Sequence, residues 1–178
     1  MVLYGKIITY NNEPINAFFH SNSGGKTEIP FNVWGGSNYP YLQTVETSGE
    51  ENYTQYSSAV ELTRDEIIDK LKEYGKDIKL EQINEEEIKI QEYNESGRVK
   101  SLKIGNTVLS GVEARKIFGL RSTNFNIKIE NEKVLFNVIG YGHGVGLSQT
   151  GSDSLAKQGK NYEEIIKHFY KNVEIVNY

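Results

Sequence analysis

Hydrophobic and polar residues alternate along two neighbouring stretches in the second half of the chain. Residues 125–129 and 134–138 each place apolar side chains at every other position, with Asn131-Glu132 between them. A period of two is typical of strands with one buried face, so these stretches predict a β-hairpin. The same reasoning predicts a second hairpin from residues 88–90 and 99–104, which flank a polar turn.

Helices are predicted where a capping box precedes an apolar pattern. In this box a Ser, Thr or Asn caps the first turn and a Glu three positions later bonds back to it. The pairs are Thr63 with Glu66, Ser110 with Glu113, and Asn161 with Glu164. Residues 152–158 predict a further short helix that ends at Gly159.

The beginning of the chain is predicted to form a hairpin as well. Residues 5–10 and 15–20 are rich in β-branched and aromatic side chains, and residues 11–14 have turn chemistry. This pairing would place His20 beside the beginning of the chain, just before a small polar loop at residues 21–27. Residues 31–60 are predicted to be mostly irregular.

These elements predict an α+β fold with mixed, largely antiparallel sheets and several short helices. A length of 178 residues suits a single domain spanning 1–178. The net charge of −4, with no basic cluster, argues against nucleic acid as a partner. The absence of cysteine excludes disulfides and thiolate zinc sites. The sequence contains no signal peptide and no transmembrane segment.

The most unusual segment is residues 140–151. Five of its twelve residues are glycine, four of them at every other position, and they flank His143, one of three histidines. Alternate glycines would leave one face of a strand bare, and glycine inside a helix costs about 1 kcal/mol relative to alanine. The run therefore predicts unusual backbone angles, or the close approach of a ligand or another backbone.

The residues alone leave several kinds of chemistry open. The strand, glycine loop and helix around residue 140 lack the full dinucleotide fingerprint and the P-loop lysine, which argues against nucleotide binding. Ser148 and His143 are compatible with a hydrolase, but Ser148 misses the nucleophile-elbow pattern and is equally suited to cap a helix. His20 and His143 are candidate proton carriers or metal ligands, without the spacing of a zinc site.

Two further residues are candidates for ligand contact. Arg121 follows a predicted helix and is suited either to clamp an anion or to pair with a carboxylate. Trp34 precedes two glycines and is suited to stack on a sugar ring or to pack in the core. No pair of carboxylates stands out as general acid and base.

Three segments resemble the stage II sporulation protein D family, also called SpoIID/LytB. The segments are residues 15–42, 109–122 and 140–170, in the family's order and at its spacing. Within these segments the chain departs from the family locally, where Thr150-Gly151-Ser152 replaces an aromatic residue followed by Gly-Ala. The resemblance identifies the chain as the C-terminal portion of a member.

The resemblance implies a lytic transglycosylase that cleaves peptidoglycan glycan strands during engulfment of the forespore. It also implies an extracytoplasmic location in the septal space, anchored to the membrane in the full-length protein, with other engulfment proteins as partners. The family's catalytic glutamate lies upstream of the first matching segment, so we expect it outside this chain and the fragment to be inactive alone. The family's zinc ligands lie upstream as well, and we expect no metal or cofactor here.

The family motifs place two sets of residues in a substrate-binding cleft, in which the two glycine-rich loops would face each other around the glycan. With Arg121 added, the expected substrate-binding residues are His20, Ser21, Ser23, Gly24, Gly25, Arg121, Tyr141, His143, Ser148 and Gln149. Two alternatives stay open. One is a non-catalytic glycan-binding or amidase-enhancing module, and the other is an unrelated serine or metal hydrolase.

Overall fold

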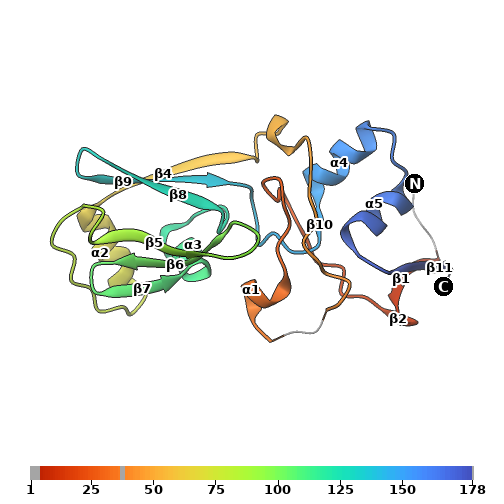
Figure 1. The fold of residues 1–178 in the computed structure, drawn as a ribbon, viewed down its shortest axis with the longest axis horizontal. Helices are drawn as coiled ribbons and strands as arrows, with labels where there is room; N and C mark the ends of the chain where they lie inside the picture. Colours follow the sequence, from red (N-terminus) through yellow and green to blue (C-terminus); the bar gives the residue numbers. More distant parts are fainter. Residues whose placement is uncertain (1–4, 37–38, 178) are drawn as a thin grey trace. The chain divides into compact units, whose positions relative to one another are not determined.

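The computed structural model describes residues 5–36 and 39–177. Its chain forms two compact units, drawn in Figure 1. Unit 1 comprises residues 1–53 and 143–178, and unit 2 comprises residues 54–142. In sequence, unit 2 is therefore an insertion between the two segments of unit 1. The expectation of a single domain over residues 1–178 stays a prediction.

The fold is α+β with largely antiparallel sheets, as predicted. Unit 2 contains two three-stranded antiparallel sheets, with strand orders β4-β9-β8 and β5-β6-β7. The strands are β4 (Ser57–Thr63), β5 (Ile88–Tyr93), β6 (Val99–Ile104), β7 (Thr107–Ser110), β8 (Phe125–Glu130) and β9 (Lys133–Ile139). Both predicted hairpins, β5–β6 and β8–β9, are confirmed. Asn131 and Glu132 turn the second hairpin with φ of 49° and 60°, the left-handed geometry of a tight hairpin turn.

Two helices of unit 2 begin at the predicted capping boxes. Thr63 caps α2 (Arg64–Glu73) and Ser110 caps α3 (Gly111–Phe118), and in each the glutamate three residues later bonds back to the cap. The reciprocal bonds satisfy backbone N–H groups that the first turn of a helix leaves without partners. The sequence therefore encodes these helix starts locally.

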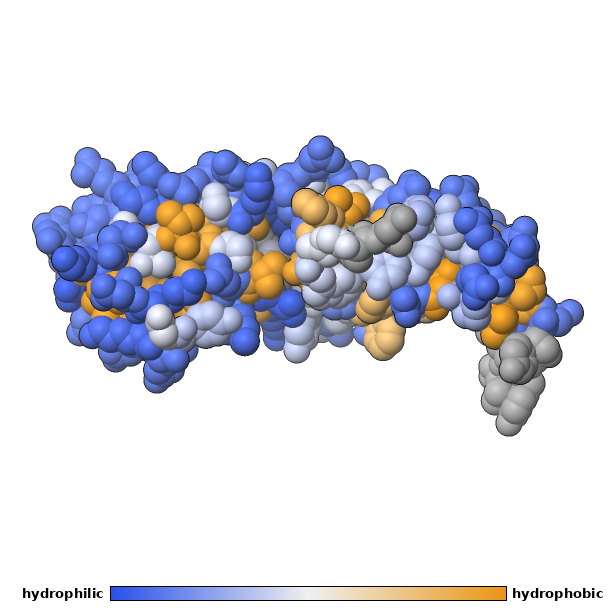
Figure 2. Space-filling model, turned by 90° about the horizontal axis from the view of Figure 1, so that it is seen from below, coloured by the Kyte–Doolittle hydropathy of each residue, from blue (hydrophilic) through white to orange (hydrophobic). Residues whose placement is uncertain are grey.

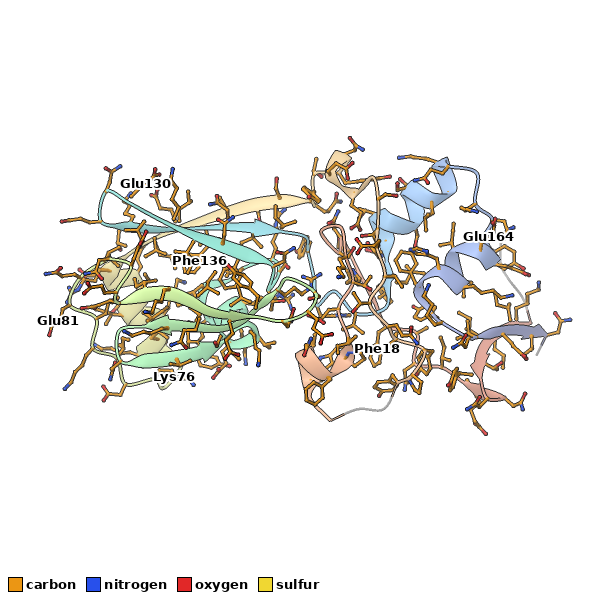
Figure 3. All side chains as sticks on the ribbon, in the orientation of Figure 1. Phe18, Lys76, Glu81, Glu130, Phe136 and Glu164 are labelled. Atoms are coloured by element: carbon orange, nitrogen blue, oxygen red, sulfur yellow. The ribbon has the colours of Figure 1, made fainter. Side chains whose placement is uncertain are left out.

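The core of unit 2 lies between its sheets and helices. Phe136 of β9 is fully buried, stacks on Phe118 at 5.3 Å between ring centroids, and meets Phe125 edge-on at 5.7 Å. Figure 3 shows Phe136 among the interior side chains of this unit. Alternate residues of β9 are buried, which is the pattern that predicted the strand.

Unit 1 contains short strands and helices joined by longer loops (Figure 1). Its first sheet has the order β11-β1-β2, and β3 pairs with β10 in a parallel two-stranded ladder. The strands are β1 (Lys6–Tyr10), β2 (Glu13–Pro14), β3 (Phe19–His20), β10 (Leu147–Ser148) and β11 (Glu174–Asn177). The helices are α1 (Pro30–Trp34), the 3₁₀ turn η1 (Glu50–Asn52), α4 (Gln149–Lys157) and α5 (Tyr162–Phe169).

The beginning of unit 1 differs from the expected hairpin. The turn after β1 is present, but only Glu13–Pro14 pairs back as strand, and the main partner of β1 is β11. The placement of His20 beside the beginning of the chain was wrong, because β3 pairs with β10 instead. A capping box at Asn161 does start α5 as predicted. The fourth predicted helix begins earlier than expected, at Gln149.

The face of the molecule in Figure 2 is mainly hydrophilic, with apolar residues in separate patches. Over the described ranges, 5–36 and 39–177, no helix is both long enough and apolar enough to cross a bilayer.

We expect Phe136→Ala to lower the free energy of unfolding of unit 2 by about 3–5 kcal/mol, because it leaves a cavity between Phe118 and Phe125. Urea denaturation followed by far-UV circular dichroism measures the change. Val108→Ala is the control, since Val108 of β7 is 55% exposed and its truncation leaves no cavity. Equal midpoints for the two variants would contradict this description of the core.

Candidate functional site

The glycine-rich run has the unusual backbone that its composition predicted. Gly140, Gly142, Gly144 and Gly146 all have φ between 73° and 116°. Gly146 also allows a close approach, because a Cβ atom built there would lie 2.1 Å from the carbonyl oxygen of Phe18. A side chain at position 146 would therefore separate the run from the chain segment beside it.

The parallel pairing of β3 with β10 begins directly after the close approach at Gly146. Leu147 N donates to Phe18 O at 3.0 Å, and further along Thr150 N donates to Ser21 O at 3.1 Å. The second half of the glycine-rich run and the loop that follows His20 thus lie side by side within unit 1. The hypothesis from the sequence, in which the two loops face each other around a glycan, stays a prediction.

A buried carboxylate, Glu50 of η1, joins these two segments. Its side chain is fully buried and accepts six hydrogen bonds from neutral donors. The donors are the backbone N–H groups of Ser23 and Gly25 and the hydroxyls of Ser23, Thr47, Ser148 and Thr150. No lysine, arginine or histidine of the described residues forms an ion pair with it. The network fixes the loop at residues 21–25 against the start of α4.

Hydrogen bonding decides the charge of Glu50. Burial by itself raises the pKa of this carboxyl group, but bonds from Ser148, Ser23, Thr47 and Gly25 outweigh it and lower the pKa to about 2. Glu50 is therefore ionised at neutral pH. A general acid in glycoside cleavage needs the opposite, a carboxyl group with a raised pKa that reaches the substrate.

The network also gives Ser23 and Ser148 a structural role. Both side chains are fully buried and donate their hydroxyl protons to Glu50. Ser148 Oγ accepts from Gly151 N at 3.3 Å as well, so it caps α4, one of the two roles that the sequence left open. These contacts make Ser148 a poor nucleophile, because substrate cannot reach its oxygen.

Both histidines contact the same residue, Val145. His20 Nδ1 donates to Val145 O at 3.1 Å, and Val145 N donates to His143 Nδ1 at 3.1 Å. Nδ1 of His20 therefore carries a proton, whereas Nδ1 of His143 carries none and accepts a hydrogen bond, so the His143 ring is neutral in this geometry. The rings lie 5.7 Å apart between centroids. His20 is buried and His143 is half-buried.

Aromatic side chains continue from His143 toward the surface of unit 1. Trp34 of α1 lies 5.2 Å from the His143 ring, and Phe18 lies 4.8 Å from Trp34. Figure 3 shows Phe18 beside α1. A hollow of about 310 Å³ opens here, which we call the aromatic hollow, lined by Asn16, Ala17, Phe18, Phe19 and His143. Trp34 and Phe19 are 48% and 61% exposed.

The remaining expected site residues are distributed between the units. In unit 1, Gln149 is exposed at the start of α4, and Ser21, Gly24 and Gly25 are half-buried in the loop beside it. Arg121 and Tyr141 belong to unit 2, where the Arg121 guanidinium carbon lies 5.1 Å from the Tyr141 ring centroid.

Sequence reasoning missed Glu50. It was one of 24 acidic residues, and its neighbour Glu51 is exposed. Only the fold distinguishes the two, because the six donors come from sequence positions as far away as Thr150. No local pattern in a single sequence carries that information.

A family model described as "Domain of unknown function (DUF8618)" matches residues 46–146, which is more than half of the chain. The chain belongs to this family. The DUF8618 match includes all of unit 2 and extends into unit 1 far enough to contain Glu50 and His143.

Curated relatives extend the similarity over nearly the whole chain. Stage II sporulation protein D of Bacillus subtilis (strain 168) is 34% identical over 96% of this chain and 48% of its own length. The protein of the same name from Bacillus amyloliquefaciens is 31% identical over the same shares. The amidase enhancer of B. subtilis is 27% identical over 98% of this chain and 31% of its own length. The chain spans about half the length of the first two relatives, and the resemblance to stage II sporulation protein D is confirmed.

We expect Glu50→Gln to destabilise unit 1 by about 3–5 kcal/mol, because an amide offers one acceptor oxygen where a carboxylate offers two. Trp34 is the chain's single tryptophan and lies in unit 1, so its fluorescence in a urea titration reports this unit. Glu51→Gln is the matched control at the exposed neighbouring position. Equal urea midpoints for the two variants would show that the network does not stabilise the fold.

The stability of unit 1 should also fall with pH in a window that Glu50 sets. Its pKa is about 2 in the folded chain against 4.5 for the ordinary group, so its contribution is complete above pH 4.5 and disappears as pH falls toward 2. The pKa difference corresponds to about 3 kcal/mol. The free energy of unfolding is measured against pH for the unmodified chain and for Glu50→Gln. The difference between the two curves cancels the contributions of the other carboxylates. A flat difference between pH 5 and 2 would contradict the assignment.

Proposed function

We propose that this chain is a peptidoglycan-binding part of a sporulation cell-wall protein, and that its aromatic hollow holds a glycan strand. The observation that carries the proposal is the group of rings at this hollow: exposed Phe19 and half-buried His143 line it, and exposed Trp34 lies against His143. Aromatic rings in a concave site pack against the apolar faces of sugar rings, and a few polar groups fix orientation. The printed names of the relatives favour the same biological setting.

The polar groups around the hollow suit a neutral sugar. The ring of His143 is neutral in this geometry, with Nδ1 accepting from Val145 N, so its Nε2–H is a hydrogen-bond donor. Asn16 adds an amide that both donates and accepts. These groups match the hydroxyl and acetamido groups of an aminosugar without requiring a charge on the ligand.

The buried Glu50 network stabilises the segments that carry such a site. It holds the loop that follows His20 against the segment that follows His143, so both histidines are anchored on a rigid base. Binding sites are more effective when their supporting side chains are already ordered, because less entropy is lost on binding.

Cleavage of the glycan is a separate proposal, made for the whole protein. Lytic transglycosylase chemistry needs a group that protonates the glycosidic oxygen. The described residues that line the aromatic hollow include no carboxyl group, and Glu50 is buried and ionised. We therefore assign binding to this chain and no catalytic role to its described residues.

The hydrolase alternative is less well supported than glycan binding. Ser148 is fully buried in the Glu50 network, which argues against a serine nucleophile. Within residues 5–36 and 39–177, no group of three or more His, Asp and Glu side chains is arranged to hold a metal ion.

The proposal places the protein outside the cytoplasm, in the septal space between forespore and mother cell, with peptidoglycan and other engulfment proteins as partners. Peptidoglycan lies outside the cytoplasmic membrane, so a protein that binds it must act there. The argument rests on the relatives' names and on the binding chemistry above.

A second candidate is a module that stimulates an amidase of the cell wall. It is favoured by the similarity to the protein named amidase enhancer, which extends over 98% of this chain. Purified cell walls incubated with a wall amidase, with and without this chain, separate the two functions. Faster release of stem peptides would support the enhancer, whereas glycan binding without a change in rate would support the binding unit.

We expect Trp34→Ala to weaken binding to purified glycan strands by about tenfold, because it removes an exposed aromatic ring that packs against Phe18 and His143 beside the hollow. Co-sedimentation over a range of protein concentrations measures the affinity. Phe31→Ala is the control, since Phe31 is an exposed aromatic residue of the same helix and, unlike Trp34, has no ring contact with Phe18 or His143 among the described residues. Equal binding by both variants would place the glycan elsewhere.

The same strands provide a test of the missing catalytic group. We expect the chain to bind them without releasing anhydro-muropeptides, which chromatography with mass detection would reveal. Release of these products by the chain alone would contradict our assignment of binding without cleavage.

A further inference from the structure

A second hollow lies on the surface of unit 1, and we call it the tyrosine groove. Its volume is about 390 Å³, and it is formed by the β1–β2 hairpin and by residues 39–41. The side chains that line it include Tyr10, Glu13 and Pro14 from the hairpin and Tyr39, Pro40 and Tyr41 from the other segment. A concave surface that is mainly aromatic, with a few polar groups, is typical of a ligand-binding site.

Backbone turns hold both segments of the tyrosine groove in place. Residues 11–12 turn the hairpin with φ of 51° and 65°, the left-handed angles of a two-residue turn, and Tyr10 pairs with Glu13 across it. In the other segment, Leu42 N donates to Tyr39 O at 2.9 Å. The groove is therefore formed before any ligand binds, which reduces the entropy lost on binding.

Aromatic rings connect the tyrosine groove to the aromatic hollow. Between ring centroids, Tyr41 lies 5.5 Å from Tyr10 and 5.9 Å from Tyr39. Tyr39 lies 5.6 Å from Phe18, which lines the aromatic hollow. A hydrogen bond makes a second connection, because Asn16 also lines that hollow and its backbone N–H donates to the Tyr41 hydroxyl at 3.0 Å. The two hollows are therefore neighbours within unit 1.

The side chains of the tyrosine groove favour an uncharged ligand with hydroxyl groups. The half-buried rings of Tyr10 and Tyr39 offer flat apolar faces, against which a sugar ring packs. Exposed Asn11 and Glu13 add an amide and a carboxylate, which accept hydrogen bonds from hydroxyl groups. Among the described residues, no lysine, arginine or histidine lines this groove, and the Glu13 carboxylate repels an anionic ligand.

We infer that the tyrosine groove is a second sugar subsite, which binds an uncharged N-acetylated sugar further along the strand that the aromatic hollow holds. The choice of a sugar rests on the proposed function, whereas the groove and its connection to the hollow rest on the geometry above. Aromatic grooves also bind proline-rich peptides. The connection favours the glycan, because a strand that enters one hollow presents its next sugars to the neighbouring one.

The test is a calorimetric titration of the full chain with chitobiose and chitohexaose, the disaccharide and the hexasaccharide of N-acetylglucosamine. Both sugars are neutral, so neither a peptide nor a carboxylate of the ligand contributes to binding. We expect the hexasaccharide to bind at least about tenfold more tightly than the disaccharide, because only the longer sugar contacts both hollows at once.

Tyr10→Leu should reduce this advantage of the hexasaccharide to about threefold or less, because it removes one flat ring of the groove and leaves the aromatic hollow intact. Leucine keeps an apolar side chain at this half-buried position, and far-UV circular dichroism checks the fold. Tyr93→Leu is the matched control, since Tyr93 of β5 is 52% exposed, belongs to unit 2 and lines neither hollow. The comparison of the two sugars on the unmodified chain needs no variant.

Two results would overturn the subsite. One is equal affinity of the unmodified chain for the two sugars, and the other is an equal advantage of the hexasaccharide in Tyr10→Leu and Tyr93→Leu. A titration with decaproline tests the other ligand. Binding of decaproline that Tyr10→Leu abolishes, without a preference for the longer sugar, would overturn the choice of a sugar.

Failure of this subsite and failure of the proposed function give different results. Equal affinities for the two sugars, both weakened by Trp34→Ala, keep the proposed function and overturn the subsite. A hexasaccharide affinity that falls in Tyr10→Leu but not in Trp34→Ala keeps a sugar site in the tyrosine groove and overturns the aromatic hollow as the glycan site.

Discussion

The ionised carboxylate of Glu50 is the constraint on which unit 1 depends. An unpaired charge is costly to bury, and here six neutral hydrogen bonds replace its water shell. Because five of the six donors come from two segments separated by more than a hundred residues, the same bonds that satisfy the charge also align β3 with β10. The histidines and the aromatic hollow are positioned by this alignment, so the surface chemistry of the unit depends on a fully buried group.

The sequence was most informative where structure is determined locally. The capping boxes at Thr63, Ser110 and Asn161 each encode a helix start in four consecutive residues. The alternation of apolar and polar residues along β8 and β9 encodes a hairpin. It was least informative where the partner is distant. The pairing of β1 with β11 was missed because a short apolar strand can form backbone hydrogen bonds with any available strand edge. From the sequence, β1 was expected to pair with the next stretch along the chain.

The candidate site shows the same division between local and distant information. The left-handed angles of the glycine-rich run follow from its composition. The shared contact of both histidines with Val145 did not, since it needs the parallel pairing that brings His20 to that peptide. Contact with Val145 therefore leaves Nδ1 protonated in His20 and unprotonated in His143, which makes the two rings chemically different.

The two units use charged side chains differently: in unit 1 the charge of Glu50 stabilises the fold, whereas in unit 2 two arginines keep hydrogen-bond donors available. Glu50 has every lone pair directed at a donor, and a fully satisfied charge has no capacity left for binding. Arg115 and Arg121 are the reverse case, because most of their donors have no acceptor in the described chain. A chain with a net charge of −4 has carboxylates enough to neutralise both arginines, yet they are placed elsewhere, on Lys76 and Lys133 for example. Leaving those donors open is therefore a property of this fold rather than of its composition.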